Sequence, residues 1–363
     1  MNNETTLSGL SFEKFRKEID GKETRLYALT NENGCELTIC NFGARIISLL
    51  VPDNNGNMVD VVTGHDSIDT ILTTGDRYFG VICGRYANRI ARGKFELDGI
   101  TYDNLAINNG PNNLHGGIKG FNEQVWDAEQ LDNQTIVLRY TSPDGEEGFP
   151  GNLSATVTYR LTQDNSVDIT YEATTDKATV VNLTNHAFFN LSGVGETTVD
   201  DHTLTIKASH YLPTDETAIP YGDPAPVAGT PMAFDTPHTI GERIDEPFEQ
   251  LIFGHGYDHC YVLDKGDGIY AEVAECSSPR TGIVLTVLTT EPGIQLYTAN
   301  WLDGKNIGKH GKYYNARTSF CLETQHYPDS PNHPQYPSTI LRPGETFKSH
   351  TTFKFSKDLC YFQ

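Results

Sequence analysis

Residues 153–162, Leu-Ser-Ala-Thr-Val-Thr-Tyr-Arg-Leu-Thr, alternate apolar and polar side chains over ten positions. Successive side chains of a strand point to opposite faces, so this period of two predicts a half-buried β-strand. Residues 167–173 repeat the pattern, and near the C-terminus Phe347, Phe353 and Phe355 fall on one face of a third strand. Strands of this kind recur along the chain and favour an all-β fold.

Turn signals and the scarcity of helical periodicity support the same fold class. Asp98-Gly99 suits the positive φ angles of a type I′ turn and predicts a hairpin over residues 95–102. Residues 283–288 are continuously apolar, which is typical of a strand buried on both faces. Short helices are possible only near residues 11–17 and 66–72, and residues 213–237, with six prolines, indicate an ordered loop. We therefore expect one mostly antiparallel unit of two packed sheets and few short helices.

The net charge argues against polyanionic ligands, and the cysteines indicate the redox state of the protein. The 48 acidic and 27 basic residues give a formal net charge of −21, which argues against nucleic acid and anionic membranes as ligands. A neutral small molecule remains compatible with this charge. The seven cysteines form no CxxC pair and indicate reduced thiols. The start of the chain has no signal-peptide pattern and no apolar run approaches the ~18 residues of a membrane span, so we expect a cytoplasmic protein.

Four polar clusters stand in strand-like surroundings. They contain the adjacent pair Asn88 and Arg89, His115 before two glycines, His186 among amides and aromatic residues, and Glu323 after an apolar stretch. Such groups can bind sugar hydroxyls or transfer protons. Each also has a structural interpretation: an arginine paired with an acid, a surface-loop histidine, a core histidine and a partnered buried carboxylate. Taken singly, no cluster decides between the two.

In their order along the chain, however, the clusters closely resemble the aldose 1-epimerases, or galactose mutarotases. The resemblance runs from about residue 12 to the C-terminus. Its stretches are Asn41-Phe-Gly-Ala-Arg45-Ile, Gly84-Arg-Tyr-Ala-Asn88-Arg89-Ile-Ala, Asn113-Leu-His115-Gly-Gly, Asn185-His186-Ala-Phe-Phe-Asn190-Leu, Tyr211-Leu-Pro-Thr-Asp215-Glu-Thr-Ala-Ile-Pro220, Tyr257-Asp258-His-Cys-Tyr, Pro292-Gly-Ile-Gln295-Leu-Tyr-Thr-Ala-Asn300 and Glu323-Thr-Gln-His-Tyr-Pro-Asp329.

The resemblance implies a galactose-mutarotase-like β-supersandwich with one sugar site in a cleft on one sheet. It also implies one aldose 1-epimerase domain over residues 1–363, of which residues 1–11 are an N-terminal extension. Its partner is expected to be a free aldose such as galactose or glucose, and the protein a monomer or weak dimer. No cofactor and no metal are expected, because anomer exchange involves neither redox change nor group transfer.

The same resemblance implies the roles of individual residues. Glu323 is the expected general base, and His186 is the expected general acid that protonates the ring oxygen O5. His115 is a competitor for that proton. The residues expected to hold the sugar are Asn88, Arg89, His115, Asp258 and Gln295. Ring opening needs an ionised carboxylate and a protonated imidazole, whose ordinary pKa values are about 4.3 and about 6.5. We expect a nearby anion to keep His186 charged at neutral pH.

Other functions stay open on the sequence. A glycoside hydrolase needs two carboxylates about 5–9.5 Å apart, for which Glu323 and Asp258 are available. A non-catalytic sugar-binding protein needs only the hydroxyl-binding residues. A metal site at His255 and His259 is disfavoured, because glycines flank His255 and no HExxH pattern is present.

Overall fold

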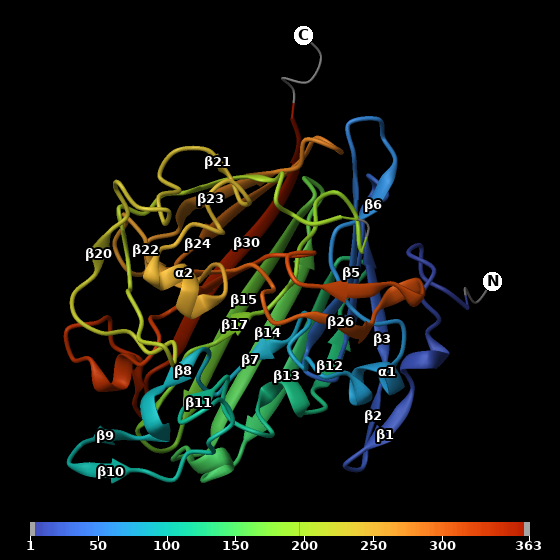
Figure 1. Ribbon diagram of the computed structural model, residues 1–363. Helices are drawn as coiled ribbons and strands as arrows, with labels where there is room; N and C mark the ends of the chain where they lie inside the picture. Colours follow the sequence, from blue (N-terminus) through green and yellow to red (C-terminus); the bar gives the residue numbers. More distant parts are fainter. Residues whose placement is uncertain (1–3, 196, 359–363) are drawn as a thin grey trace.

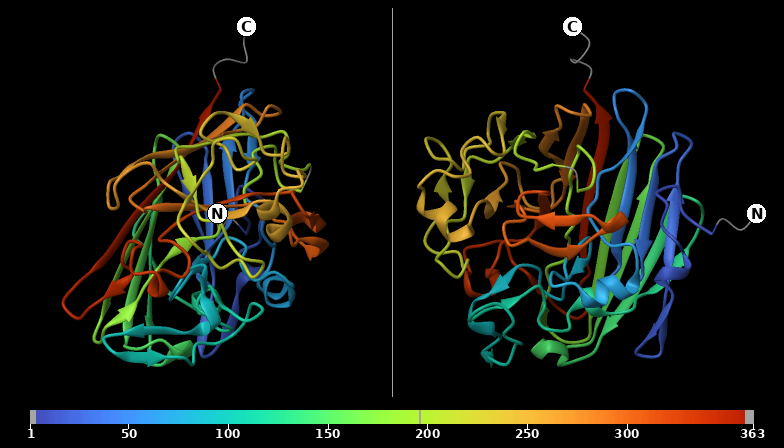
Figure 2. Two further views of the ribbon diagram at one scale, coloured as in Figure 1. Left: turned by 60° about the vertical axis from the view of Figure 1, so that its left-hand side comes forward. Right: turned by 45° about the vertical axis from the view of Figure 1, so that its right-hand side comes forward.

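The computed structural model describes residues 4–195 and 197–358, and every ladder between its strands is antiparallel (Figure 1). The nine-stranded sheet has the order β12 (Asp127–Gln130), β13 (Thr135–Ser142), β14 (Leu153–Leu161), β15 (Ser166–Thr175), β30 (Phe347–Lys357), β24 (Ile283–Thr289), β23 (Ala271–Ser277), β18 (Thr203–Ile206) and β21 (His238–Thr239). Its long central strands lie side by side in both views of Figure 2.

Two smaller sheets lie against this large sheet. The five-stranded sheet has the order β20 (Ala225–Pro226), β19 (His210–Tyr211), β22 (Asp258–Val262), β25 (Gly293–Tyr297) and β28 (Cys321–Gln325). The four-stranded sheet consists of β3 (Leu26–Thr30), β4 (Glu36–Cys40), β5 (Arg45–Pro52) and β6 (Met58–Asp60).

The remaining elements are short. Six two-stranded pairs are β1 (Lys17–Ile19) with β2 (Lys22–Thr24), β7 (Ile82–Cys83) with β17 (Thr184–Asn185), β8 (Arg89–Ile90) with β11 (Asn113–Leu114), β9 (Phe95–Leu97) with β10 (Ile100–Tyr102), β16 (Thr179–Val180) with β29 (Ile340–Leu341), and β26 (Asp303–Ile307) with β27 (Tyr313–Asn315). The α-helices in the described ranges are α1 (Ile68–Thr73) and α2 (Glu249–Gly254). Neither they nor any other described helix is long and apolar enough to cross a membrane.

One hydrophobic core joins the three larger sheets. The inward side chains of β14, which include Leu153, Val157 and Tyr159, are buried in the same cluster as residues of β5 and β28. Burial of this apolar surface is the main force that holds the layers together. Two polar contacts cross the same interface: the Tyr159 hydroxyl donates to the Ala44 carbonyl at 2.7 Å, and the Thr324 and Thr351 hydroxyls lie 2.6 Å apart. The expected two packed sheets are thus one nine-stranded layer against a layer of several smaller sheets.

Most sequence-based expectations for single elements are confirmed. The strands of residues 153–162 and 167–173 are β14 and β15, and Phe353 and Phe355 are buried on the same face of β30. The β9–β10 turn has φ of 54° at Asp98 and 76° at Gly99, as the predicted turn requires. β24 is buried along most of its length and half-buried at Thr286 and Leu288.

The helices differ more from expectation. The helix expected at residues 66–72 is α1, which runs over Ile68–Thr73 and whose first turn is capped by the Ser67 hydroxyl accepting from the Thr70 amide. Within residues 11–17 the chain makes only a 3₁₀ turn at Glu13–Phe15. The helix α2 is not predicted from the sequence, because six residues hold less than two turns and show no period. Residues 1–3 of the expected N-terminal extension lie outside the described residues, and its remainder packs on β4, with the Leu7 and Ser8 amides donating to the Glu36 carboxylate.

Gly80 joins the four-stranded sheet to the segment that carries His186. Its carbonyl accepts from the Ile46 amide and its own amide donates to the His186 carbonyl, both at 2.9 Å. Its φ is +71°, and a Cβ atom at this position would lie 2.0 Å from the Ile46 carbonyl oxygen. Both the backbone conformation and the space therefore require glycine.

We predict that Gly80→Ala lowers the free energy of unfolding by about 3 kcal/mol, from ~1–2 kcal/mol for the left-handed backbone and ~1–3 kcal/mol for the steric conflict. Gly222→Ala is the matched control, because Gly222 has φ +69° and a Cβ atom there would meet nothing within 4 Å. Urea unfolding should show a much smaller loss for Gly222→Ala. Equal losses in the two variants would contradict the steric account.

Candidate active site

A cleft of about 950 Å³ opens beside the five-stranded sheet and brings most of the predicted site residues together. Six of the seven predicted residues line it: Asn88, Arg89, His115, His186, Asp258 and Glu323. The seventh, Gln295, lies behind the surface of the cleft and contacts Asp258. The sequence clusters are therefore neighbours in space although they span more than 230 positions of the chain.

Three adjacent strands position the acidic side of the cleft. Asp258 begins β22, Gln295 is central in β25 and Glu323 is central in β28, with Gln295 and Glu323 directly paired across the ladder. The Gln295 side-chain amide donates to Asp258 Oδ1 at 2.7 Å and so fixes that carboxylate. Among the described residues, the buried Oε2 of Glu323 and Oε1 of Gln295 have no hydrogen-bond partner. A buried acceptor without a partner is costly, so the oxygen of Glu323, which lines the cleft, is suited to a hydroxyl donor of a ligand.

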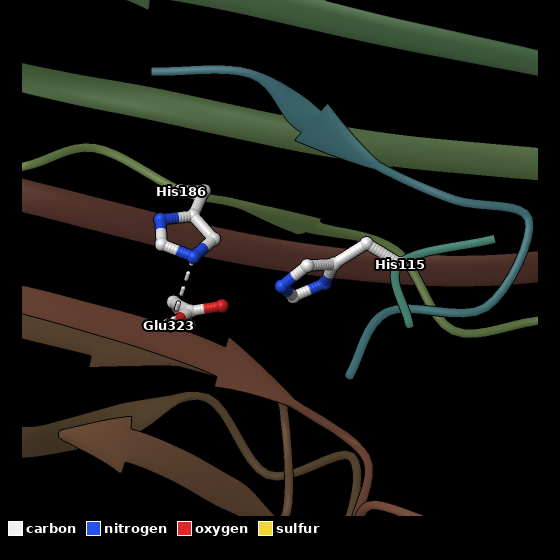
Figure 3. Close-up of side chains that lie close together, drawn as sticks. All are labelled: His115, His186 and Glu323. Carbon is white, nitrogen blue, oxygen red and sulfur yellow. Dashed lines mark ion pairs between the residues drawn. The ribbon is translucent and has the colours of Figure 1, made fainter. Parts of the chain in front are cut away.

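His186 follows β17 and faces Glu323 across a short gap. Its backbone amide donates to the Val81 carbonyl at 2.9 Å, which fixes the segment. Its Nε2 lies 3.5 Å from Glu323 Oε1, and its Nδ1 lies 3.5 Å from the Cys321 sulfur. Figure 3 shows His115, His186 and Glu323 pointing toward one another from separate elements.

The ring of His115 is fixed by the backbone of Asn88. The Asn88 amide donates to His115 Nδ1 at 3.0 Å, and the His115 amide returns a hydrogen bond to the Asn88 carbonyl at 2.9 Å. A backbone N–H can only donate, so Nδ1 must be the unprotonated acceptor nitrogen. His115 is therefore a neutral imidazole whose proton is on Nε2, and its ring centroid lies 5.2 Å from that of His186.

Arg89 lines the cleft beside Asp258. Its Nε donates to Asn109 Oδ1 at 2.9 Å, and its Nη2 lies 4.0 Å from Asp258 Oδ2. The Asn88 side-chain oxygen accepts from the Arg89 backbone amide at 2.9 Å. The arginine thus keeps guanidinium donors available beside a carboxylate that Gln295 already holds, which is an arrangement suited to neighbouring hydroxyls.

Burial dominates the electrostatics of the site. It raises the pKa of Glu323 well above its ordinary value, with a further upward contribution from Asp258, while Arg89 acts in the opposite direction. Burial also lowers the pKa of His186 to about 4. The pKa of His115 is held well below its ordinary value by burial, with smaller contributions from His186 and Arg89. The expectation that a nearby anion keeps His186 charged is therefore wrong, because burial outweighs it for the imidazole and disfavours the charged form of the neighbouring carboxyl group as well.

The same three groups also form a possible metal-binding set. The ligand atoms of His115, His186 and Glu323 all lie within 4.8 Å of one another. Two imidazoles and a carboxylate are donors that transition metals accept. His115 offers only Nε2 to such an ion, because the Asn88 amide occupies Nδ1.

Aromatic residues complete the cleft, and none of them is among the seven site residues predicted from the sequence. Phe188 stacks on His186 with ring centroids 4.9 Å apart, and the buried Tyr297 lies edge-on to His186 at 6.2 Å. The exposed Trp301 also lines the cleft. Phe188 and Tyr297 belong to stretches that carry the family resemblance, which is the signal that could have found them. Tyr78, which also lines the cleft, belongs to none of these stretches. Only its position in space brings it to the site.

Comparison with known proteins identifies the family of the chain. Residues 25–354 match the Aldose 1-epimerase protein family. The chain belongs to the aldose 1-epimerase family. It is 44% identical to the galactose mutarotase of Homo sapiens over 88% of this chain and 90% of that relative, and 38% identical to the aldose 1-epimerase of Escherichia coli (strain K12) over 93% and 96%.

Solved structures of the aldose 1-epimerase family have the same fold. The aldose epimerase homologue from C. elegans superposes with a TM-score of 0.84 at 29% identity, covering 92% of this chain and 99% of that one. The galactose 1-epimerase from Lactobacillus acidophilus NCFM gives a TM-score of 0.82 at 28% identity, covering 94% and 97%. The expected β-supersandwich is thereby confirmed.

A buried ion pair stands at the end of the strand that carries Glu323. His326 Nδ1 lies 2.6 Å from Oε2 of the buried Glu291, and His326 Nε2 lies 3.8 Å from Asp267 Oδ2. Burial alone would lower the pKa of His326, but Glu291 and Asp267 outweigh it and the pKa is raised, with Lys265 opposing weakly. The pair therefore favours the protonated imidazole in the folded chain.

This ion pair predicts a pH-dependent contribution to stability. Because the folded pKa is raised, the contribution is full below the unfolded value of about 6.5 and is lost as pH rises through the folded pKa. The difference in unfolding free energy between wild type and His326→Gln should therefore be largest near pH 6 and shrink toward pH 9. Chemical denaturation across that range measures it, and a difference that grows with pH would contradict the pairing.

Proposed function

We propose that this member of the aldose 1-epimerase family interconverts the α and β anomers of free aldohexoses such as galactose and glucose. The observation that carries the proposal is the Glu323 carboxyl group facing the His186 imidazole at 3.5 Å in the buried part of the cleft. An acid and a base side by side can act on the C1 hydroxyl and the ring oxygen of one sugar at the same time. The enzyme is an isomerase, and its reaction returns both groups to their starting states.

The reaction is a pair of proton transfers in each direction. In ring opening, Glu323 removes the proton of the C1 hydroxyl, the C1–O5 bond breaks as C1 becomes an aldehyde, and His186 Nε2 protonates O5. Glu323 is then a carboxylic acid and His186 a neutral imidazole. After rotation about C1–C2, O5 attacks the other face of the aldehyde, His186 takes the proton from O5, and Glu323 protonates the carbonyl oxygen. Positioned acid or base catalysis contributes about 10²–10⁴-fold per group.

Burial favours the neutral forms of Glu323 and His186, which suit the ring-closing half of this cycle. A neutral Glu323 and a neutral His186 are the protonation states that ring closure requires. Ring opening requires the same number of protons, with one moved from the carboxyl group to the imidazole. The sugar hydroxyls, the His115 Nε2–H group and Arg89 can supply hydrogen bonds and charge that favour the carboxylate, since Glu323 Oε2 is without a partner among the described residues.

We assign the acid role to His186 and a fixed donor role to His115. An acid that protonates O5 must afterwards be a stable neutral group. His115 is already neutral, with Nδ1 accepting from the Asn88 amide, so loss of its Nε2 proton would leave an imidazolate. We propose that His115 donates a hydrogen bond to the sugar, and that Asn88, Arg89, Asp258 and Gln295 hold and orient the remaining hydroxyls.

The first test is polarimetry of freshly dissolved α-galactose and α-glucose in buffer that contains EDTA and no added metal. Wild type should accelerate mutarotation, and Glu323→Gln should lower kcat by about 10²–10⁴-fold while sugar binding persists. Glu172→Gln is the control, because Glu172 lies on the exposed face of β15, outside the cleft, and pairs with Lys348.

Three outcomes of this experiment would overturn the proposal. Undiminished activity of Glu323→Gln would remove it as the base, and activity lost to EDTA and restored by a divalent cation would indicate a metal site at the same residues. Sugar binding without acceleration by wild type would favour a sugar-binding protein. Cleavage of a chromogenic glycoside without mutarotation would favour a hydrolase that uses Glu323 and Asp258.

The two histidines should respond differently to substitution. His186→Asn should lower kcat by about 10²-fold or more, because it removes the proton donor. His115→Asn should lower kcat by about tenfold and raise KM, because it removes one hydrogen bond to the sugar. Steady-state polarimetry on both variants gives the comparison, and the reverse order of the kcat losses would show that His115 is the acid.

We further propose that the chain acts as a single domain in the cytoplasm, with a free aldose as its small-molecule partner and without nucleic acid. The six cysteines in the described ranges are buried free thiols, which suits a reducing compartment. The formal net charge of −21 disfavours polyanionic ligands. The proposed assembly is a monomer or weak dimer.

A further inference from the structure

Tyr78 forms the wall of the cleft that covers both histidines. Its ring centroid lies 4.7 Å from that of His115 and 6.0 Å from that of His186, to which it is nearly parallel at 21°. Phe188 lies on His186 as well, at 4.9 Å and 22°. Two aromatic rings thus stack on the imidazole next to Glu323, and one of them also contacts the second imidazole.

The segment that carries Tyr78 is held firmly in place. The Tyr78 amide donates to Asp76 Oδ1 at 2.9 Å. The Asn306 side-chain oxygen in β26 accepts three hydrogen bonds from this segment: from the Thr74 hydroxyl at 2.6 Å and from the amides of Gly75 and Asp76 at 3.2 and 3.3 Å. Two residues after Tyr78, Gly80 bonds directly to the His186 backbone. The ring and the imidazole therefore belong to one hydrogen-bonded frame.

The hydroxyl of Tyr78 differs from those of the tyrosines that support the fold. The hydroxyls of Tyr159, Tyr257, Tyr261 and Tyr314 each donate to a backbone carbonyl at 2.7–2.9 Å. Within the described ranges, the hydroxyl of Tyr78 makes no hydrogen bond to the protein, and the half-buried residue lines the cleft. Burial raises the pKa of Tyr78, so the group stays a neutral phenol that can donate as well as accept.

We propose that Tyr78 is a sugar-binding and positioning residue of this site, an inference that rests on the proposed anomer exchange. Its hydroxyl forms a hydrogen bond with a hydroxyl of the bound aldose. Its ring packs against the imidazoles of His115 and His186 and fixes their orientation. Because the ring contacts both imidazoles, it covers the side of the site where O5 receives its proton. The ring also covers part of His186 and so reduces its contact with water.

The stack has two physical effects on His186. Two apolar faces remove the imidazole from water and make its protonated form a stronger acid. The same faces attract a cation once it forms, since the π electrons of an aromatic ring interact with positive charge above its plane. Loss of the Tyr78 ring should therefore change the acidity of His186 as well as its orientation, whereas loss of the hydroxyl alone should change sugar affinity.

Three variants separate these contributions. Tyr78→Phe removes only the hydroxyl, Tyr78→Leu removes the ring, and Tyr221→Phe is the control, because Tyr221 is exposed and lies outside the cleft. We expect Tyr78→Phe to raise the KM for galactose about 3–10-fold, as for loss of one hydrogen bond, with kcat within about twofold of wild type. Tyr78→Leu should lower kcat about tenfold or more. It should also move the limb of the pH–rate profile that reports His186 to lower pH, because leucine keeps an apolar surface there but has no π electrons to attract the cation.

Binding measured without turnover keeps this inference separate from the proposed function. The galactose Kd is measured by calorimetry in a Glu323→Gln background, with and without Tyr78→Phe. A Kd about 3–10-fold weaker in the double variant supports sugar contact by Tyr78, even if wild type proves to bind sugar without isomerising it. An unchanged Kd and KM in the nearly isosteric Tyr78→Phe would overturn the sugar contact. An unshifted pH profile in Tyr78→Leu would overturn the positioning role.

Discussion

A buried carboxyl group and a buried imidazole lie 3.5 Å apart, so the protonation state of each depends on that of the other. The architecture of the site follows from this constraint. Removal of both groups from water raises the pKa of Glu323 and lowers that of His186, and so favours the neutral form of each group. In the interior, a charged pair costs several kcal/mol unless hydrogen bonds support it. The charged form of Glu323 therefore needs hydrogen-bond donors from the sugar. Its Oε2 atom, which has no partner among the described residues, can accept them.

Contacts outside the cleft hold Glu323 and His186 in position relative to each other. Glu323 is held by the ladder with β25, while His186 is held by the segment that contains Gly80 and Val81. A buried cation joins the nearby layers. Lys309 is completely buried and donates to the carbonyls of Ile47 and Val62 and to Asp60. The interatomic distances in the active site thus depend on the packing of several sheets, not on one loop.

The fold class and most of the site could be predicted from the sequence, for physical reasons. Alternation along β14 and β15 reports burial directly, and the acid, base and hydroxyl-binding residues stand in short stretches of recognisable composition. The burial of single polar side chains cannot be read in this way, and so the charge state expected for His186 was wrong. Tyr78 could not be predicted, because its neighbours in the chain, Arg77 and Phe79, give it no motif; only the fold brings its ring to the two histidines.

The hydrogen bond from the Asn88 amide to His115 has a wider consequence. A main-chain N–H group has no titration in the range where proteins function, and no amino-acid replacement other than proline removes it. The proton of His115 is thereby kept on Nε2 by the backbone amide of Asn88, which side-chain substitutions leave in place. The Nδ1 atom of His186, in contrast, lies 3.5 Å from the Cys321 thiol, which is a weak partner and leaves that ring free to gain and lose a proton. Two identical side chains are in this way made chemically unequal by the atoms that surround them.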